Sequence, residues 1–261
     1  MAVSENRMSE TGPILAGDID IAATAILLDV DGTLIEIAAT PEAVRVPPSL
    51  VHTLARLRDK LEGALCLVSG RPIAVLDRLF SPLRVAIVGG HGAEARLSPH
   101  GMTVRSRVHP IEPELRQRLL AIAGDTPGLL AESKEYSVAL HYRLAPELEH
   151  IVRDQIKALC DAYGHGAVEV LPGKSVFEVK PVGFNKGIAI REVMRHAPFA
   201  GRTPIFMGDD VTDESGFAAV GELGGLGFSV GRRLPKTKGL FGTPREVRSW
   251  LYALLRGPET G

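Results

Sequence analysis

Three short apolar runs in the chain each end at a polar residue, a pattern typical of strands buried on both faces of a parallel sheet. The runs are residues 25–28 before Asp29, residues 65–68 before Ser69, and residues 204–207 before Gly208 and Asp209. Leu50, Leu54, Leu57 and Leu61 recur at helical spacing between the first two runs. Ligands of open α/β sheets bind at the carboxyl ends of the strands. The pattern therefore predicts an α/β fold with polar residues gathered at one edge of its sheet.

The interval between the second and third runs predicts an inserted domain. Leu115, Leu119 and Ile122 indicate a helix. The next expected elements are strands at 129–132 and 137–142, a helix from Pro146 to Tyr163 stopped by Gly164, and strands at 167–171 and 175–179. This αββαββ order indicates an α+β unit with a hinge at Pro181 and Gly183. We assign residues 1–20 to a loose arm, 21–107 and 183–261 to the core, and 108–182 to the insertion.

A DVDGT motif that follows the first run supplies two carboxylates. Asp29 and Asp31 are two residues apart, so in an extended segment both side chains leave on the same side, roughly 6 to 7 Å apart. The Thr33 hydroxyl can hydrogen-bond within the following turn. A plain acidic turn would explain the motif equally well. A calcium EF-hand loop would not, because Leu34 and Thr40 stand where it requires glycine and glutamate.

Three further motifs supply polar groups. They are SGR at residues 69–71, NKG at residues 185–187 and GDDVTDE at residues 208–214. Each by itself has a purely structural explanation: the start of a helix, a solvated surface lysine, or aspartates that cap a helix. Their combination with DVDGT, in this order and after buried strands, instead predicts a magnesium-dependent phosphotransfer site.

The four motifs resemble those of the haloacid dehalogenase (HAD) superfamily of phosphohydrolases, and together they span most of the chain. The resemblance implies an α/β fold, with an HAD-like Rossmannoid core around a parallel sheet and an inserted α+β cap domain. It also implies that Asp29 attacks phosphorus, while Asp31 protonates the leaving oxygen and later activates water. A carboxylate can split ester hydrolysis into two displacements if cations neutralise its repulsion from the phosphate.

Mg²⁺ and Lys186 are the expected cations. Because Mg²⁺ takes hard oxygen ligands and keeps several bound waters, the protein needs to supply only a small share of its ligands. This share would be the Asp29 carboxylate, the Asp31 backbone carbonyl and Asp209, while Asp213 would hold a metal-bound water. Lys186 is expected between Asp29 and the phosphoryl group. The residues expected to bind phosphate are Thr33, Ser69, Gly70 and Arg71.

Three segments resemble the trehalose-6-phosphate phosphatase branch of the superfamily. They are GGHGAE at 89–94, ESKEYSVALHYR at 132–143 and GKSVFEVKP at 173–181. The resemblance implies that cap residues bind sugar hydroxyls; the candidates are Lys174, Glu178, Arg143, Lys134 and His91. Strands with a polar outer face would also account for these side chains. The sequence departs from the branch at Val30, where an aromatic residue is common, at Asn185, where aspartate is common, and at Lys180, where arginine is usual.

Several other functions share parts of this pattern. A phosphatase of sucrose 6-phosphate or mannosyl-3-phosphoglycerate would have the same core and a similar cap. A sugar phosphomutase would return the phosphoryl group to a sugar. A receiver domain of a response regulator also uses aspartate, magnesium and lysine, but it lacks the second aspartate and the αββαββ insertion. The expected reaction is hydrolysis of trehalose 6-phosphate to trehalose and inorganic phosphate.

Composition agrees with a soluble enzyme that acts on a small molecule. The 261 residues carry a net charge of −1, which provides no electrostatic footprint for nucleic acid or an anionic membrane. Cys66 and Cys160 lie in apolar patterns and are expected as unpaired core residues, as suits a reducing cytoplasm. Asp18 and Asp20, rather than basic residues, precede the first apolar stretch, so no signal peptide is expected. We expect a cytoplasmic monomer or weak oligomer.

Overall fold

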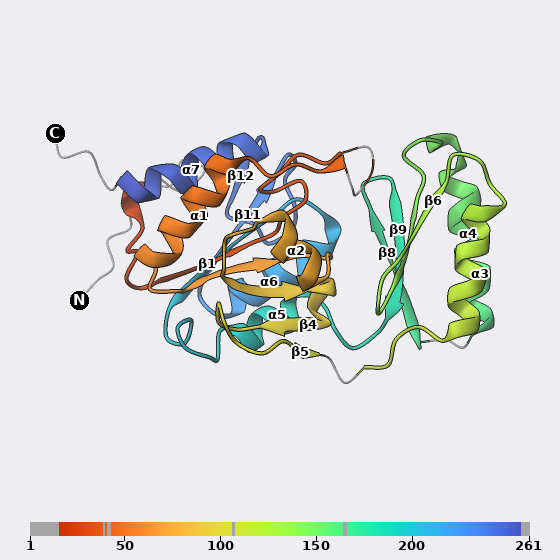
Figure 1. Cartoon of the computed structure of the whole chain (residues 1–261), viewed down its shortest axis with the longest axis horizontal. Coiled ribbons are helices and arrows are strands. Elements are labelled where there is room, and N and C mark those ends of the chain that lie inside the picture. The colour runs from red at the N-terminus through yellow and green to blue at the C-terminus, as the bar shows by residue number, and fades with distance from the viewer. Residues whose placement is uncertain (1–15, 39, 41–42, 106–107, 164–165, 257–261) are drawn as a thin grey trace.

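A computed structural model describes residues 16–38, 40, 43–105, 108–163 and 166–256. Their strands form two separate sheets, which lie in two lobes of an elongated molecule (Figure 1). Most of the predicted N-terminal arm lies outside the described residues. Its last part contains the short 3₁₀ helix η1, Ala16–Asp18.

The larger sheet has eight strands in the order β12-β11-β10-β1-β2-β3-β4-β5. Its strands from β12 to β3 are parallel, and β4 and β5 are added antiparallel at one edge. The bounds are β1 Thr24–Leu28, β2 Leu65–Val68, β3 Ala86–Gly89, β4 Glu94–Arg96, β5 Val104–Arg105, β10 Thr203–Gly208, β11 Leu226–Val230 and β12 Gly239–Phe241. The three strands predicted from apolar runs are β1, β2 and β10, and all of them are central. Their apolar residues are buried on both faces, as a parallel sheet requires.

Helices cover this sheet and complete its core. Their bounds are α1 Pro48–Lys60, α2 Ile73–Leu79, α5 Lys186–Val193, α6 Glu214–Glu222 and α7 Pro244–Arg256, with 3₁₀ turns η3 Gly90–Gly92 and η5 Val211–Asp213. The predicted leucine stripe is confirmed: Leu50, Leu54 and Leu57 of α1, and Leu61 at its end, are all buried. Helix α1 packs beside α7, and α5 packs beside α6. Asp29, Ser69 and Asp209 directly follow β1, β2 and β10, so they stand at the carboxyl ends of these strands.

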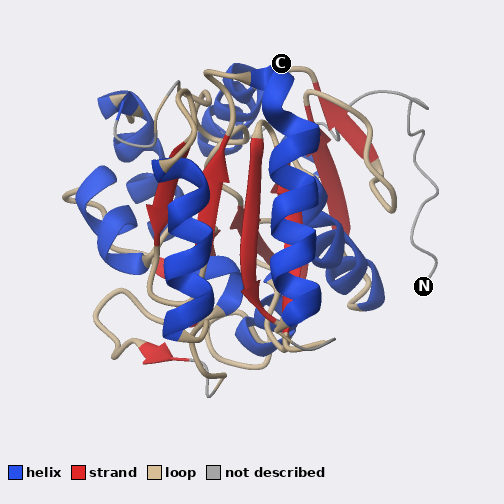
Figure 2. Ribbon diagram, turned by 90° about the vertical axis from the view of Figure 1, so that its right-hand side faces the viewer, coloured by secondary structure: helices blue, strands red, loops and turns tan. Residues whose placement is uncertain are grey.

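The smaller sheet is antiparallel, with the order β6-β7-β9-β8. Its elements are α3 Pro113–Gly124, β6 Leu130–Ser133, β7 Val138–His141, η4 Pro146–Leu148, α4 Glu149–Ala162, β8 Val168–Gly173 and β9 Val176–Pro181. The predicted αββαββ order is therefore confirmed, with strand limits that differ by one or two residues. The helix stop assigned to Gly164 lies outside the described residues. Figure 2 shows α3 and α4 in front of the strands of this sheet.

Each lobe has its own hydrophobic core. In the smaller lobe, Leu119 of α3 and Ile156 of α4 pack on Val138 and Val179 of the sheet, and all four side chains are fully buried. The core of the larger lobe contains none of these residues. This separation supports the predicted division into a core and a cap, and it confirms the fold class. The boundaries at 107/108 and 182/183, and the hinge at Pro181 and Gly183, stay predictions.

Both cysteines are free. Cys66 is buried in β2, and burial raises the pKa of its thiol to about 12. The prediction that the two cysteines do not pair with each other is thus confirmed. Among the described residues, no helix combines the length and apolar character that a membrane crossing needs.

Candidate active site

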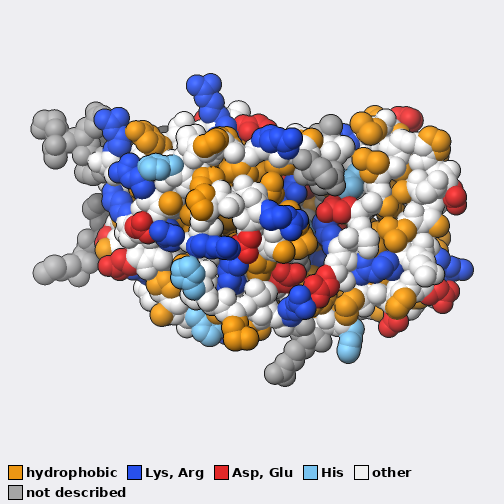
Figure 3. Space-filling model, in the orientation of Figure 1, with side chains coloured by type: hydrophobic (Ala, Val, Ile, Leu, Met, Phe, Trp, Pro, Cys, Tyr) orange, Lys and Arg blue, Asp and Glu red, His pale blue; other side chains and the backbone are white. Residues whose placement is uncertain are grey.

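A cavity of about 190 Å³ lies between the two lobes, at the carboxyl ends of the parallel strands. Charged side chains gather along this junction on the molecular surface (Figure 3). Every predicted site residue except Thr33 and Asp213 lines the cavity. The sequence motifs therefore meet in space, although they lie in both lobes.

Three carboxylates cluster at the floor of the site, two of them lining the cavity and Asp213 directly behind it. One carboxylate oxygen from each of Asp29, Asp209 and Asp213 lies within 4.8 Å of the others, and all three residues are buried. The sheet explains the first two positions, because β1 and β10 are adjacent and the Asp29 N–H donates to the Met207 carbonyl at 2.9 Å. Gly32 has φ +83°, and a Cβ there would lie 2.1 Å from Asp209 Oδ2. Glycine is therefore required for the two loops to meet this closely.

Lys186 is buried against two of these carboxylates. Its Nζ lies 2.7 Å from Asp29 Oδ1 and 2.6 Å from Asp213 Oδ1. The alternative of a solvated surface lysine is therefore wrong. Lys186 is the first residue of α5, whose N-cap Asn185 accepts a hydrogen bond from the Ile188 N–H at 2.9 Å. Burial lowers the Lys186 pKa, but the two carboxylates outweigh burial and raise it above its ordinary value.

Asp213 holds the loop that carries Asp209. It is the last residue of η5, the short 3₁₀ helix that follows β10. Its Oδ2 accepts hydrogen bonds from the backbone N–H groups of Asp209 at 2.9 Å and Asp210 at 3.1 Å. A Cβ at Gly208 would lie 2.4 Å from Asp213 Cγ, so this close approach also requires glycine. Asp213 thus orients Asp209 and Lys186 from behind the cavity wall.

The electrostatics of the carboxylate floor suit a divalent cation. Burial raises the pKa of Asp29 well above its usual value, and Asp213 and Asp209 add to this effect against the opposing charge of Lys186. Burial and Asp213 raise the pKa of Asp209 to about 6, although Lys174 opposes the shift. The excess of negative charge and the hard oxygen donors fit Mg²⁺. The described residues therefore form an acidic cluster that could hold the expected metal.

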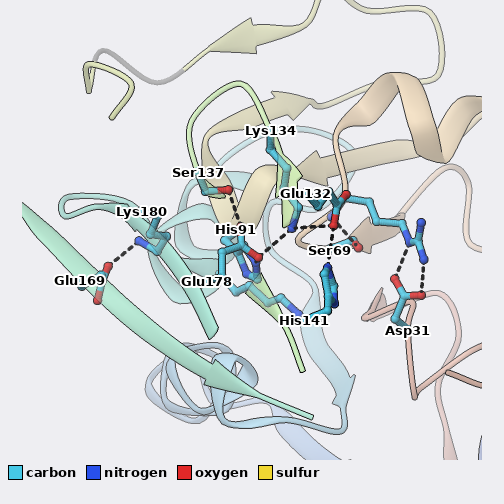
Figure 4. Close-up of polar contacts among 12 residues, drawn as sticks. Asp31, Ser69, His91, Glu132, Lys134, Ser137, His141, Glu169, Glu178 and Lys180 are labelled. Atoms are coloured by element: carbon cyan, nitrogen blue, oxygen red, sulfur yellow. Dashed lines mark hydrogen bonds and ion pairs between the residues drawn. The ribbon is translucent and has the colours of Figure 1, made fainter. Parts of the chain in front are cut away.

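Asp31 is held by Arg71 in a bidentate ion pair. The Arg71 Nε and Nη2 donate to Asp31 Oδ2 at 2.6 Å and Oδ1 at 2.8 Å (Figure 4). The backbone N–H of Arg71 also donates to the Ser69 Oγ at 3.1 Å. Sequence reasoning gave Asp31 and Arg71 separate roles and did not predict their pairing. Two motifs forty positions apart, DVDGT and SGR, are thus joined by this contact.

His91 links the core to the cap. It adopts φ +57° in η3, and its Nε2 lies 3.1 Å from Glu178 Oε2 on β9. Gly70 makes room for the ring, because a Cβ there would lie 2.3 Å from the same nitrogen. His91 and Gly70 therefore position Glu178 over the cavity.

Glu178 is the centre of a polar network on the cap sheet. It accepts hydrogen bonds from Lys134 Nζ at 2.7 Å and from the Ser137 Oγ (Figure 4). Burial alone would raise the Glu178 pKa, but Lys134 and His91 outweigh burial and hold it well below its usual value. Glu178 is therefore a carboxylate at neutral pH.

Two residues of this network were missed by sequence reasoning. Glu132 and His141 line the cavity, and their side chains lie 3.3 Å apart on β6 and β7. Both residues belong to the ESKEYSVALHYR segment, and successive side chains of a strand point to opposite faces, so Ala139 and His141 line the cavity while Val138 and Leu140 pack in the cap core. Only the packing of the cap on the core shows which face of the sheet reaches the cavity.

Arg143 and Lys174 connect the tip of the cap to the core. Arg143 donates to the Ala38 carbonyl of the core and to the Lys174 carbonyl, each at 2.7 Å. The Lys174 ammonium forms an ion pair with Asp209. Both residues line the cavity, but in this structure they bind protein groups. Their predicted contacts with sugar hydroxyls stay predictions.

Two other residues have roles that the sequence did not indicate. Thr33 is fully buried away from the cavity lining, and its hydroxyl has no hydrogen-bond partner among the described residues. The predicted side-chain hydrogen bond within the turn is therefore wrong, and the predicted contact of Thr33 with phosphate stays a prediction. Lys180 is buried beside the predicted hinge, where it binds the Glu169 carboxylate and the Phe184 carbonyl. It is absent from the described cavity lining.

Comparisons with known proteins agree with this geometry. A family model described as trehalose-phosphatase matches residues 27–237. A probable trehalose-phosphate phosphatase of Sinorhizobium fredii (strain NBRC 101917 / NGR234) is 42% identical over 226 residues, which cover 86% of this chain and 84% of that protein. The trehalose-6-phosphate phosphatase of Escherichia coli (strain K12) is 38% identical over 230 residues, which cover 88% and 86%.

Solved structures show the same fold. The C-terminal domain of Candida albicans trehalose-6-phosphate phosphatase has a TM-score of 0.80 and 24% identity, and the match covers 90% of this chain and 93% of that one. A phosphatase of the HAD superfamily from Bacteroides thetaiotaomicron has a TM-score of 0.59 and 15% identity, with 88% and 94% covered. The family match extends from β1 into the segment before β12 and includes all four motifs. The chain therefore belongs to the trehalose-phosphatase family.

Proposed function

We propose that this protein hydrolyses trehalose 6-phosphate to trehalose and inorganic phosphate. The observation that carries the proposal is the position of Asp29 and Lys186 at the floor of a cavity whose outer wall is the charged face of the cap sheet. The floor is suited to a phosphoryl group, and the wall offers donors and acceptors to sugar hydroxyls. The names of the two relatives that match most of the chain support this substrate.

In the proposed reaction, an Asp29 oxygen attacks phosphorus and the bond from phosphorus to the sugar oxygen breaks. Asp31 gives a proton to the departing sugar oxygen. Asp31 then takes a proton from water, which attacks phosphorus and breaks the bond to Asp29. Phosphate leaves, and both aspartates return to their starting states. Lys186 holds Asp29 in place and offsets its charge during the attack.

Proton transfer by Asp31 requires a change in its contact with Arg71. A bidentate guanidinium uses both carboxylate oxygens as acceptors. At least one of these hydrogen bonds must open before Asp31 can carry a proton. A phosphate next to Ser69 and Gly70 would provide an alternative acceptor for Arg71. We therefore propose that substrate binding draws Arg71 from Asp31 to the phosphate.

Mg²⁺ is the metal that the residues of the floor would hold. Its proposed protein ligands are the Asp29 carboxylate, the Asp31 backbone carbonyl and Asp209, and Asp213 would contact it through water. When bound, it would offset the negative charge of the phosphate. Asp213 and Lys186 keep the donor atoms of Asp29 and Asp209 fixed.

The proposed sugar contacts come from the cap and from His91. The candidates are His91, Lys134, Arg143, Lys174 and Glu178, to which the structure adds Glu132 and His141. Glu178 and Lys134 are already oriented by their mutual ion pair. An oriented pair reduces the entropy lost when a sugar is bound.

Phosphate release from a panel of sugar phosphates, assayed with Mg²⁺ present, tests the substrate. We expect trehalose 6-phosphate to be preferred over sucrose 6-phosphate and mannosyl-3-phosphoglycerate. Preference for one of the latter would overturn the assignment. Incorporation of ¹⁸O from water into the released phosphate separates hydrolysis from phosphomutase activity. Asp29→Asn should abolish turnover, and a trapped label on any residue other than Asp29 in the parent would contradict the mechanism.

We also propose that the enzyme works in the cytoplasm as a monomer or weak oligomer, on a small molecule and without nucleic acid or membrane partners. The net charge of −1 and the free cysteines support this proposal. Light scattering after size-exclusion chromatography tests the oligomeric state.

A further inference from the structure

The turn between β8 and β9 carries a cap lysine into the carboxylate floor. The Lys174 ammonium pairs with Asp209, whose side chain is 3% exposed, whereas the Lys174 side chain is 39% exposed. Asp209 is one of the three clustered carboxylates. A residue of the cap thus contacts a proposed metal ligand of the core.

This turn has a second attachment to the core. Arg143 joins the Lys174 carbonyl to the Ala38 carbonyl, with 2.7 Å at each contact. A Cβ at Gly173 would lie 3.1 Å from Asp210 Oδ2, so the turn also lies directly against the loop of Asp209. The ion pair of Lys174 is therefore part of how the cap tip rests on the core.

The ion pair of Lys174 with Asp209 takes part in the charge balance of the carboxylate cluster. Asp29, Asp209 and Asp213 meet two ammonium groups, those of Lys186 and Lys174. If Mg²⁺ were bound, its two charges and that of Lys186 would balance the three carboxylates without Lys174. Because Lys174 is partly exposed, its ammonium can leave Asp209 for water or for a phosphate at low cost.

We infer that Lys174 is an internal cation that competes with Mg²⁺ for Asp209, so that metal binding releases one attachment of the cap tip. This inference rests on the proposed magnesium site. In the metal-free protein, Lys174 holds the tip against the floor. In the metal-bound protein, the freed ammonium is available to the phosphate dianion of the substrate. Metal loading and release of the tip are reciprocal, because a contact that opposes metal binding is itself weakened by the metal.

Calorimetric titration of the metal-free protein with Mg²⁺, without substrate, tests the competition. Lys174→Met keeps the length of the side chain and removes its charge, and we expect it to tighten Mg²⁺ binding about tenfold. The matched control is Lys134→Met, which also removes a positive charge from the cavity lining but from a lysine paired with Glu178. We expect the control to change Mg²⁺ affinity about twofold or less.

The calorimetric results separate a failure of the competition from a failure of the proposed metal site. Equal tightening in the two variants would indicate a general field effect and overturn the competition. Unchanged affinity in Lys174→Met would do the same. Failure of the parent protein to bind Mg²⁺ would instead overturn the proposed metal site. Circular dichroism verifies that both variants fold.

Hydrogen exchange in the β8–β9 segment, residues 168–181, provides an independent measurement on the unmodified protein. We expect Mg²⁺ to speed exchange around Lys174 in the parent, because the metal removes one attachment of the turn. In Lys174→Met, exchange should be fast with or without the metal. If Mg²⁺ slowed exchange in the parent and slowed it equally in Lys174→Met, the release of the tip would be contradicted.

Discussion

Asp31 and Arg71 are joined by two parallel hydrogen bonds, 2.6 Å and 2.8 Å long, that occupy both oxygens of the proposed proton donor. Arg71 belongs to the same short loop as Ser69, which is proposed to bind phosphate. Arg71 therefore contacts both the proposed proton donor, Asp31, and the proposed phosphate-binding residue, Ser69. Substitutions can therefore test whether Asp31 acts by transferring a proton or by holding the geometry of the site.

Asp31→Asn should lower the turnover of trehalose 6-phosphate by roughly 10² to 10⁴, because the amide cannot transfer the proton. The loss should be smaller with nitrophenyl phosphate, whose leaving group needs no proton. Steady-state kinetics with both substrates give this comparison. An equal loss on the two substrates would show that Asp31 acts through the geometry of the site rather than as an acid.

Lys186→Met should destabilise the protein by about 3 to 5 kcal/mol, because it leaves two buried carboxylates without their shared partner. Urea denaturation of the metal-free protein measures this change. The control is Lys157→Met, which breaks an exposed ion pair with Asp161 on α4 and should hardly alter stability. If both variants were equally stable, the buried cluster would have little influence on the fold.

The stabilising contribution of Glu178 should be lost in acid. Its pKa in the folded protein lies well below the ordinary value of 4.5, because Lys134 and His91 outweigh burial. A carboxyl with a lowered folded pKa binds fewer protons when folded, so it stabilises the protein above about pH 4.5 and stops doing so as the pH falls further. We expect Glu178→Gln to be less stable than the parent at neutral pH.

Urea denaturation of both proteins between about pH 3 and pH 7 measures the difference in unfolding free energy. The difference should shrink as the pH falls below about 4.5. A difference that stayed constant over this range would mean that the charge of Glu178 does not contribute to stability.

Gly70→Ala should impair the sugar phosphate reaction more than the aryl phosphate reaction. The new Cβ would lie 2.3 Å from His91 Nε2, so the imidazole must move and lose its contact with Glu178. We expect kcat/KM for trehalose 6-phosphate to fall about tenfold, the equivalent of about 1.4 kcal/mol.

The control for this substitution is Gly221→Ala in α6, where a Cβ would meet nothing within 4 Å. It should leave both reactions unchanged. If Gly70→Ala lowered both reactions alike, the contact of His91 with Glu178 would support the phosphate site and not the sugar site.

The amino-acid sequence by itself determined the three strands, β1, β2 and β10, whose carboxyl ends carry the candidate site. The apolar runs before Asp29, Ser69 and Asp209 specify buried strands because burial on both faces excludes polar residues from them. The αββαββ order of the cap is also local, since it follows from helical and alternating periodicity. The family motifs lie on these elements, so the proposed catalytic residues could be chosen before the fold was seen.

Only the tertiary structure decided how these residues pair. The contacts of Asp31 with Arg71 and of Lys174 with Asp209 join segments about 40 and 35 positions apart. Periodicity carries no information on such pairs, because they depend on the order of strands and on how the cap packs on the core. The same holds for Thr33, whose type suits a turn or a phosphate site but whose loop packs its hydroxyl inward. Local sequence fixes which side chains are available, and long-range packing decides which of them face one another.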